Sequence, residues 1–309
     1  MSDSAEIMRR ARAAGTVLPA FNVPYLPMVE PVVRAVRDQD SFALIETARL
    51  EWIKFEARGP AEVAAEYRKW ADPDRVRLHL DHLPVIDEDG RRVDYLPVVR
   101  TALELGYDSV MVDGSRLPLG ENIAATRAAA ALAHAAGVPC EAELGSVLGH
   151  ESGPPPPYEE LFRTRRGFTD PSEAARFAAE SGCDWLSVAA GNIHGAISGA
   201  LKDQAKPQAR LDLDHISRLY EAAGRRPLVL HGGSGIAREF VLGAVARGIA
   251  KVNVGAEIRL AYEQALRKSG RVSAAQDAVY ERTVRLLREH FGVAGSRETL
   301  GLRGNPERS

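Results

Sequence analysis

Residues 227–235 have the sequence PLVLHGGSG, in which a short apolar run ends in a histidine and a glycine-rich turn follows. The next stretch, 238–247, carries an amphipathic helical pattern. A buried parallel strand that leads through a tight turn into a helix is expected to look like this. The segment therefore predicts one βα unit with polar residues at the carboxyl end of its strand.

The same alternation continues in both directions along the chain. Helical patterns such as 121–136 and 171–181 lie between the apolar runs. The predicted strands are residues 17–22, 42–46, 76–81, 109–113, 139–144, 185–189, 228–231 and 251–254. Eight such units predict an α/β fold of the closed (β/α)8 TIM-barrel type. An open doubly wound sheet is disfavoured because the first strand leads into Asn22-Val23-Pro24 rather than a dinucleotide-binding turn.

The ends of the chain add helices to this barrel. We expect an N-terminal helix before the first strand and an additional helix at 274–291, within a C-terminal helical extension over about 270–309. A length of 309 residues suits one barrel, so residues 1–309 are predicted to form a single domain.

Composition and charge exclude several classes of function. The net charge of −2 argues against binding to nucleic acid or to an anionic membrane surface. Two scattered cysteines, Cys140 and Cys183, do not form a disulfide framework. The charged N-terminus lacks the apolar stretch of a signal peptide, and no run is long enough to span a bilayer. We therefore expect a soluble, cytoplasmic protein.

Histidines and acids gather at the predicted strand ends. Asp81 and His82 end the third strand, His194 follows the sixth and His231 ends the seventh. Glu143 and Asn253 end the fifth and eighth strands. In a barrel these ends meet at one mouth. A single histidine there is more often structural, but three with nearby carboxylates indicate a zinc site with an open position. Such an ion would act as a Lewis acid on a substrate oxygen.

Two glycine-rich turns predict a second feature of the mouth. Gly232, Gly233 and Ser234 follow the seventh strand, and the sequence VNVG at 252–255 ends the eighth. Barrels commonly bind phosphate at these two places through backbone N–H groups and a helix N-terminus. A tight turn needs glycine in any case, but the position favours phosphate binding.

Lysine chemistry is the alternative for a barrel of this kind. A Schiff-base mechanism needs a reactive lysine inside the barrel near its active rim. Lys251 begins the predicted eighth strand and is therefore expected at the opposite end of the barrel, and the other lysines lie in predicted loops or helices. The metal mechanism is favoured.

Several motifs occur together in the order and spacing of a known family. They are LPAFNV, LHLDH, SVMVDGS with ENI, EAELG, TDP, GNIHG, LVLHGGSGI and KVNVGAEIR. Over roughly residues 5–268 the chain resembles the class II fructose- and tagatose-bisphosphate aldolases. The resemblance implies a lyase of carbohydrate metabolism and glycolysis. It also implies a phosphorylated sugar as substrate, release of dihydroxyacetone phosphate or a similar ketone, and assembly as a homodimer or homotetramer.

The resemblance also assigns roles to residues. His82, His194 and His231 become ligands of one zinc ion per chain, for which cobalt or iron(II) are alternatives, and Glu143 an alternative ligand. A monovalent cation is a further cofactor to consider. Asp81 and Glu151 become proton-transfer acids, and Asn253 the residue that holds the enediolate. We expect Glu151 on a mobile lid formed by residues 145–167. The expected substrate and phosphate contacts are Asn22, Gly195, Gly232, Gly233, Ser234, Gly255 and Ala256.

Departures from the family pattern concern the substrate rather than the metal. Glu46, Arg49 and a helical insert over 46–59 replace a small glycine-rich turn, Ala256 replaces a phosphate-binding threonine, and residues 196–210 form a longer segment than expected. We expect Glu46 to repel a phosphate. Arg49 either attracts a substrate anion or pairs with Glu46 or Glu51, and Arg259 is a second candidate anion contact.

Three other functions stay open from the sequence. One is an aldolase-like enzyme for a non-bisphosphate or keto-acid substrate, and another is a non-catalytic partner subunit of another aldolase. The intact set of Asp81, His82, His194 and His231 argues against the silent subunit. A zinc hydrolase barrel is disfavoured because the first strand lacks a His-x-His pair.

Overall fold

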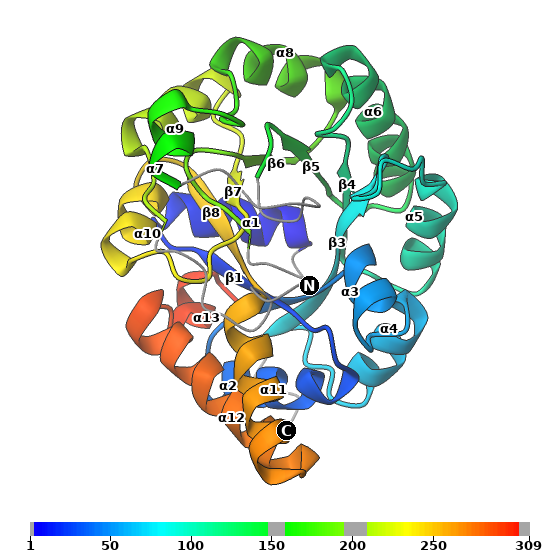
Figure 1. Ribbon diagram of the computed structural model, residues 1–309, viewed down its shortest axis with the longest axis vertical. Coiled ribbons are helices and arrows are strands. Elements are labelled where there is room, and N and C mark those ends of the chain that lie inside the picture. The colour runs from blue at the N-terminus through cyan, green and yellow to red at the C-terminus, as the bar shows by residue number, and fades with distance from the viewer. Residues whose placement is uncertain (1–2, 148–157, 195–208, 303–309) are drawn as a thin grey trace.

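The computed structural model describes residues 3–147, 158–194 and 209–302. Eight parallel strands close into a barrel in the order β1 to β8, and the helices form a ring around it (Figure 1). The strands are β1 Leu18–Asn22, β2 Ala43–Ala48, β3 Val76–Pro84, β4 Ser109–Asp113, β5 Cys140–Leu144, β6 Trp185–Val188, β7 Leu228–Leu230 and β8 Ile249–Val254. The predicted (β/α)8 barrel is confirmed.

Helices follow the strands as the sequence pattern predicts. Those between β1 and β5 are η1 Leu26–Met28, α2 Val29–Asp38, α3 Arg49–Lys54, α4 Pro60–Arg68, α5 Tyr95–Glu104 and α6 Leu119–Ala135. Those from β5 to the last strand are α7 Tyr158–Thr164, α8 Pro171–Ser181, α9 Leu213–Ala222 and α10 Arg238–Val245. The helix-compatible run after β2 forms α3, so the predicted insert is a short helix beside the barrel mouth.

An N-terminal helix closes the lower end of the barrel. Helix α1, Ser4–Ala13, lies across the barrel in Figure 1. Its buried residues Ile7 and Met8 pack in one cluster with Leu18 of β1, Trp185 of β6 and Phe42, which directly precedes β2. This floor is mainly apolar, with one buried hydrogen bond from Arg77 Nη1 to Ser4 Oγ at 3.2 Å, as expected for the end of a barrel that contributes stability rather than chemistry.

Three helices and a short π-helical turn follow β8 in the described chain. They are α11 Ala256–Ser269, α12 Val272–Arg285, the π-turn η2 Leu286–His290 and α13 Ser296–Thr299. Helix α12 packs against α11 and α2. The C-terminal extension therefore lies on the outside of the barrel, beside α2 (Figure 1). Among the described residues, no helix is long and apolar enough to cross a membrane.

Two strands extend beyond their predicted ends. Strand β2 continues past Glu46 to Ala48, and β3 continues past Asp81 to Pro84. Glu46 and Asp81, which were expected to end these strands, are buried and have polar partners, Lys251 and Asn22 respectively.

Candidate active site

A bulge in β3 brings two adjacent polar residues to the mouth. Leu80 pairs with Val110 and Leu83 with Val112, so Asp81 and His82 together lie opposite a single residue of β4. In a regular strand neighbouring side chains would point to opposite faces. Here His82 has a φ of 36°, in the left-handed region that residues with a side chain rarely adopt. The bulge re-aims His82 so that it joins Asp81 in the site.

The three predicted histidines converge at this mouth. One candidate ligand atom from each of His82, His194 and His231 lies within 4.8 Å of the others. The Nδ1 atom of His231 is only 2.7 Å from the Nε2 atom of His82. The His194 ring centroid lies 4.9 Å from that of His82 and 6.2 Å from that of His231. The structure therefore brings together residues that are up to 149 positions apart.

Acidic partners orient two of these imidazoles. The Nε2 atom of His231 lies 2.8 Å from Glu141 Oε1, and the Nδ1 atom of His82 lies 3.5 Å from Asp113 Oδ2. Each ring can thus donate its outer N–H to a carboxylate and turn the lone pair of its other nitrogen toward the shared centre. This is the usual arrangement around metal-binding histidines, so the residues fit a metal ion.

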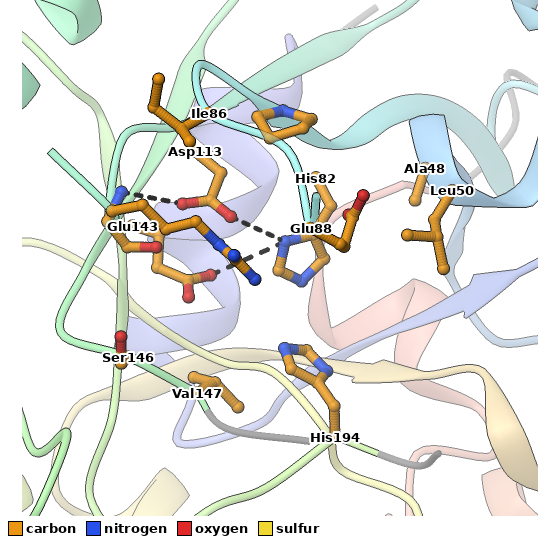
Figure 2. A pocket seen from close by; sticks show the side chains of 13 residues that line it. Ala48, Leu50, His82, Ile86, Glu88, Asp113, Glu143, Ser146, Val147 and His194 are labelled. Atoms are coloured by element: carbon orange, nitrogen blue, oxygen red, sulfur yellow. Dashed lines mark hydrogen bonds and ion pairs between the residues drawn. The ribbon is translucent and has the colours of Figure 1, made fainter. Parts of the chain in front are cut away.

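Glu143 completes the acidic surroundings. Its Oε2 atom is 3.2 Å from His231 Nδ1 and 3.8 Å from His82 Nδ1, and Figure 2 shows Asp113 and Glu143 approaching the His82 ring. Burial and the neighbouring His82 lower the pKa of His231, but hydrogen bonds with Glu141 and Glu143 outweigh them and raise it to about 9. The carboxylates therefore favour positive charge at this centre.

Two amides hold the Asp81 carboxylate. Asn22 Nδ2 donates to Asp81 Oδ2 at 2.8 Å, and Asn253 Nδ2 donates to Asp81 Oδ1 at 3.0 Å. All three side chains are at least nine-tenths buried. The Oδ1 atom of Asn253 has no hydrogen-bond partner among the described residues. Asp81 is thus fixed beside His82, and an amide oxygen next to it stays available.

A charged layer lies directly below the histidines. Lys251 Nζ is 2.5 Å from Glu46 Oε1 and 2.9 Å from Glu141 Oε2. Although burial opposes it, these carboxylates raise the pKa of Lys251, so the lysine stays protonated. Burial lowers the pKa of His79 to about 3, with the charge of Lys251 acting in the same direction. The expectation that Lys251 lies at the far end of the barrel is wrong, because its side chain points into the middle of the interior. A protonated, doubly paired amine is nevertheless no Schiff-base nucleophile.

Glycine shapes the turn after β7. Gly232 has a φ of 63°, and a Cβ there would lie 2.1 Å from the carbonyl oxygen of Ile193. A Cβ on Gly233 would lie 2.3 Å from Val252. Ser234 Oγ accepts a hydrogen bond from the backbone N–H of Glu257, 3.3 Å away. The turn therefore packs against the end of β8 and the N-terminus of α11, where Gly255 is the N-cap and Ala256 the first residue.

The structure corrects the expectations for charged residues near β2. Glu46 is fully buried and paired with Lys251, so it does not face a substrate phosphate. Arg49 pairs with neither Glu46 nor Glu51. Its Nη1 atom lies 3.5 Å from Asp87 Oδ2.

Arg259 lies beside the mouth but is already engaged. Its guanidinium is within 3.0 Å of both carboxylate oxygens of Glu263 and lies over the ring of Phe55, 5.3 Å from its centroid. Two predicted site residues, Glu151 and Gly195, fall outside the described residues.

Three residues around the site were missed at the level of sequence: Glu141, Asp113 and Asn192. Glu141 lies two positions before the predicted Glu143 on β5, and this period of two could have placed both inside the barrel. Asp113 is the last residue of β4, so the argument that placed polar strand ends at the mouth applied to it as well. Asn192 donates to the carbonyl oxygen of His231 at 3.1 Å and so ties the segment carrying His194 to β7. No local signal marks that long-range bond.

The comparisons with known proteins agree with this geometry. The family model of fructose-bisphosphate aldolase class II matches residues 2–298. The chain belongs to this aldolase family. The chain contains the candidate metal-binding group of His82, His194 and His231, as expected for a metal-dependent family.

Individual aldolases are similar over most of their length. A fructose-bisphosphate aldolase of Streptococcus pneumoniae serotype 4 is 34% identical over 282 residues, covering 90% of this chain and 86% of that protein. One from Streptococcus pyogenes serotype M3 is 32% identical over 287 residues, covering 89% and 86%. The crystal structure of the YdjI aldolase from Escherichia coli K12 has a TM-score of 0.74 at 26% identity, covering 96% of this chain and 99% of that one.

Proposed function

We propose that this chain is an aldehyde-lyase that reversibly cleaves a phosphorylated ketose. The products are dihydroxyacetone phosphate, or a similar ketone donor, and an aldehyde. The observation that carries the proposal is the pair of facing nitrogens on His82 and His231, each ring held by a carboxylate at its outer nitrogen. Membership of the class II aldolase family supports the same reaction.

His82, His194 and His231 would hold one divalent ion, and Glu143 is placed to serve as an alternative ligand. We propose zinc, with cobalt or iron(II) as alternatives, because imidazole suits all three. Bound there, the ion would supply Lewis-acid stabilisation of negative charge on substrate oxygen.

Asp81 is the proposed base for the hydroxyl at the bond that breaks. Retro-aldol cleavage removes that hydroxyl proton, and a carboxylate fixed by Asn22 and Asn253 cannot swing away from it. The free Oδ1 atom of Asn253 would orient the hydroxyls of the reacting carbons. We keep Glu151 as the proposed second proton-transfer acid.

The phosphate of the ketone donor would lie against Gly232–Ser234 and residues 253–256. The glycines allow a phosphate to approach the backbone closely, and the N-terminus of the 14-residue helix α11 favours an anion. We further propose that residues 1–309 act as one barrel domain in a cytoplasmic homodimer or homotetramer. The two buried, free cysteines are compatible with a reducing compartment.

Metal removal tests the proposal. Full-length protein is treated with a chelator, dialysed, and assayed for release of dihydroxyacetone phosphate from a panel of ketose phosphates before and after zinc is restored. Cleavage should disappear and return. His231→Ala should lose bound metal, whereas His134→Ala should keep it, because His134 is an exposed residue of the outer helix α6 that pairs with Asp184. Cleavage that survives chelation, or metal that binds His231→Ala as tightly as the parent, contradicts the proposal.

A further inference from the structure

An arginine that the proposed reaction does not use lines the cavity at the metal centre. Arg116 follows β4 and borders the same cavity as His82, Glu143 and His194. We propose that Arg116 binds the negatively charged far end of the aldehyde half of the substrate. This inference rests on the proposed function and extends it by naming the kind of substrate.

The backbone that carries Arg116 is held in place. A hydrogen bond from Leu117 N to Gly114 O, 2.8 Å long, closes a β-turn in which Arg116 is the third residue. Ser115 N donates to Asp113 Oδ1 at 2.9 Å. A Cβ on Gly114 would lie 2.2 Å from the Asn122 side chain, so the turn packs tightly on α6. Asn122 in turn donates to the carbonyl oxygen of Glu143 at 3.0 Å.

The charge of Arg116 is not neutralised by the acids around the cavity. Asp113 and Glu143 face the imidazoles of His82 and His231. Glu88 also lines the cavity, but within the described part of the chain no carboxylate forms an ion pair with Arg116. Arg49 differs, since Asp87 already lies 3.5 Å from its guanidinium. Among the described residues that line the cavity, Arg116 is therefore the arginine whose charge is available to a substrate.

The far end of a bound substrate is expected on the side of the barrel where Arg116 lies. The donor phosphate is proposed at the turns after β7 and β8, and β4 lies four strands from β8 in the closed barrel. A ketose that spans the metal centre from these turns directs its other half toward β2, β3 and β4. The cavity is lined on that side by Ala48, Leu50, Pro84, Ile86, Glu88 and Arg116; Figure 2 shows Leu50 and Glu88 there.

The chemistry of a guanidinium selects an oxyanion. Its planar set of N–H donors binds a carboxylate or a phosphate through two parallel hydrogen bonds. Both groups occur at the end of a sugar chain, so the shared recognition is an anionic terminus. Removing such charged hydrogen bonds typically weakens binding roughly 10- to 100-fold.

The experiment compares three ketose 1-phosphates that differ only at the far end. Fructose 1,6-bisphosphate ends in a phosphate, the 6-carboxylate analogue of fructose 1-phosphate ends in a carboxylate, and fructose 1-phosphate ends in a hydroxyl. Metal-loaded wild type, Arg116→Gln, Arg116→Lys and Arg49→Gln are assayed for kcat/KM with each. Arg92→Gln is the matched control, because Arg92 is exposed and bridges to Ile86, which lines the cavity, without lining it itself.

Wild type should prefer an anionic end over the hydroxyl end, and the better of the two anions identifies the natural terminus. Arg116→Gln should reduce that preference roughly 10- to 100-fold, mainly through KM, and Arg116→Lys should retain part of it. Arg92→Gln should keep the preference. The inference is overturned if wild type shows no preference, if Arg116→Gln slows all three substrates equally, or if Arg49→Gln causes the loss instead. Cleavage of none of the three would overturn the inference and also count against the proposed function.

Discussion

The floor and the upper half of the barrel interior are built from the same strands but have opposite chemistry. On the floor, Leu44 and Val229 pack with the apolar residues of α1. Two residues further along the chain in each case, Glu46 lies in the charged layer and His231 in the candidate metal-binding group. Inward-facing positions recur every second residue along a strand. One such step of about 6–7 Å therefore separates the apolar layer of the interior from the ion-paired layer.

The difference shows which part of the barrel stabilises it and which part acts. Burying Phe42 and Trp185 removes apolar surface from water, which favours folding directly. Burying Lys251 between Glu46 and Glu141 costs desolvation energy that the ion pairs must offset, so such a cluster typically adds less to stability than apolar packing does. We therefore expect the charged layer to have a role beyond stability. The hydrogen bond that Glu141 accepts from His231 connects this layer to the candidate metal-binding group.

Asp81→Ala should have the largest effect and should separate activity from metal binding. The variant loses the proposed base but keeps all three histidines, so turnover should fall about 10²–10⁴-fold while metal content stays near the parent's. The check is kcat together with metal analysis of the same sample. Wild-type turnover would remove Asp81 from the mechanism.

Phe42→Ala should affect the floor alone. Phe42 is fully buried beside α1, and its loss should destabilise the fold by about 3–5 kcal/mol. The measurement is denaturant unfolding of the parent and the variant in parallel. The folded variant should keep its metal. If the free energy of metal binding falls by more than the free energy of unfolding, the floor and the site are not independent.

Glu141→Gln should connect the two regions. The variant keeps the volume of the side chain but weakens the bond to His231 and leaves Lys251 with Glu46 alone. Metal affinity should fall about 10–100-fold, as is typical when the partner of a metal-binding histidine is changed. A competition titration with a chromogenic chelator measures it. An unchanged affinity would make the charged layer a purely structural feature.

Ser234→Ala should have the smallest effect. The hydroxyl is one neutral donor in a turn whose phosphate contacts are proposed to be mainly backbone N–H groups. Its loss should weaken binding by about 0.5–1.5 kcal/mol, which would raise KM a few-fold at constant kcat. Steady-state kinetics with a ketose 1-phosphate gives both values. A drop in kcat instead would assign Ser234 a part in the chemical step.

The sequence by itself determined the barrel and the meeting of three histidines at its mouth. Apolar runs, glycine turns and helical periods are local signals, and polar residues at strand ends meet at one mouth in any closed parallel barrel. This reasoning placed His82, His194 and His231 together before any contact was known, and the structure confirms their convergence.

Only the tertiary structure decided how these side chains are held and which charges are available. The bulge at Asp81 and His82 depends on the register between β3 and β4. The pairing of Glu46 with Lys251, of Glu141 with His231 and of Arg49 with Asp87 joins residues 38 to 205 positions apart. Local patterns carry no information about such partners, because an ion pair depends on which strands become neighbours across the interior. Whether a charged residue is buried and paired or faces the substrate is therefore settled by packing.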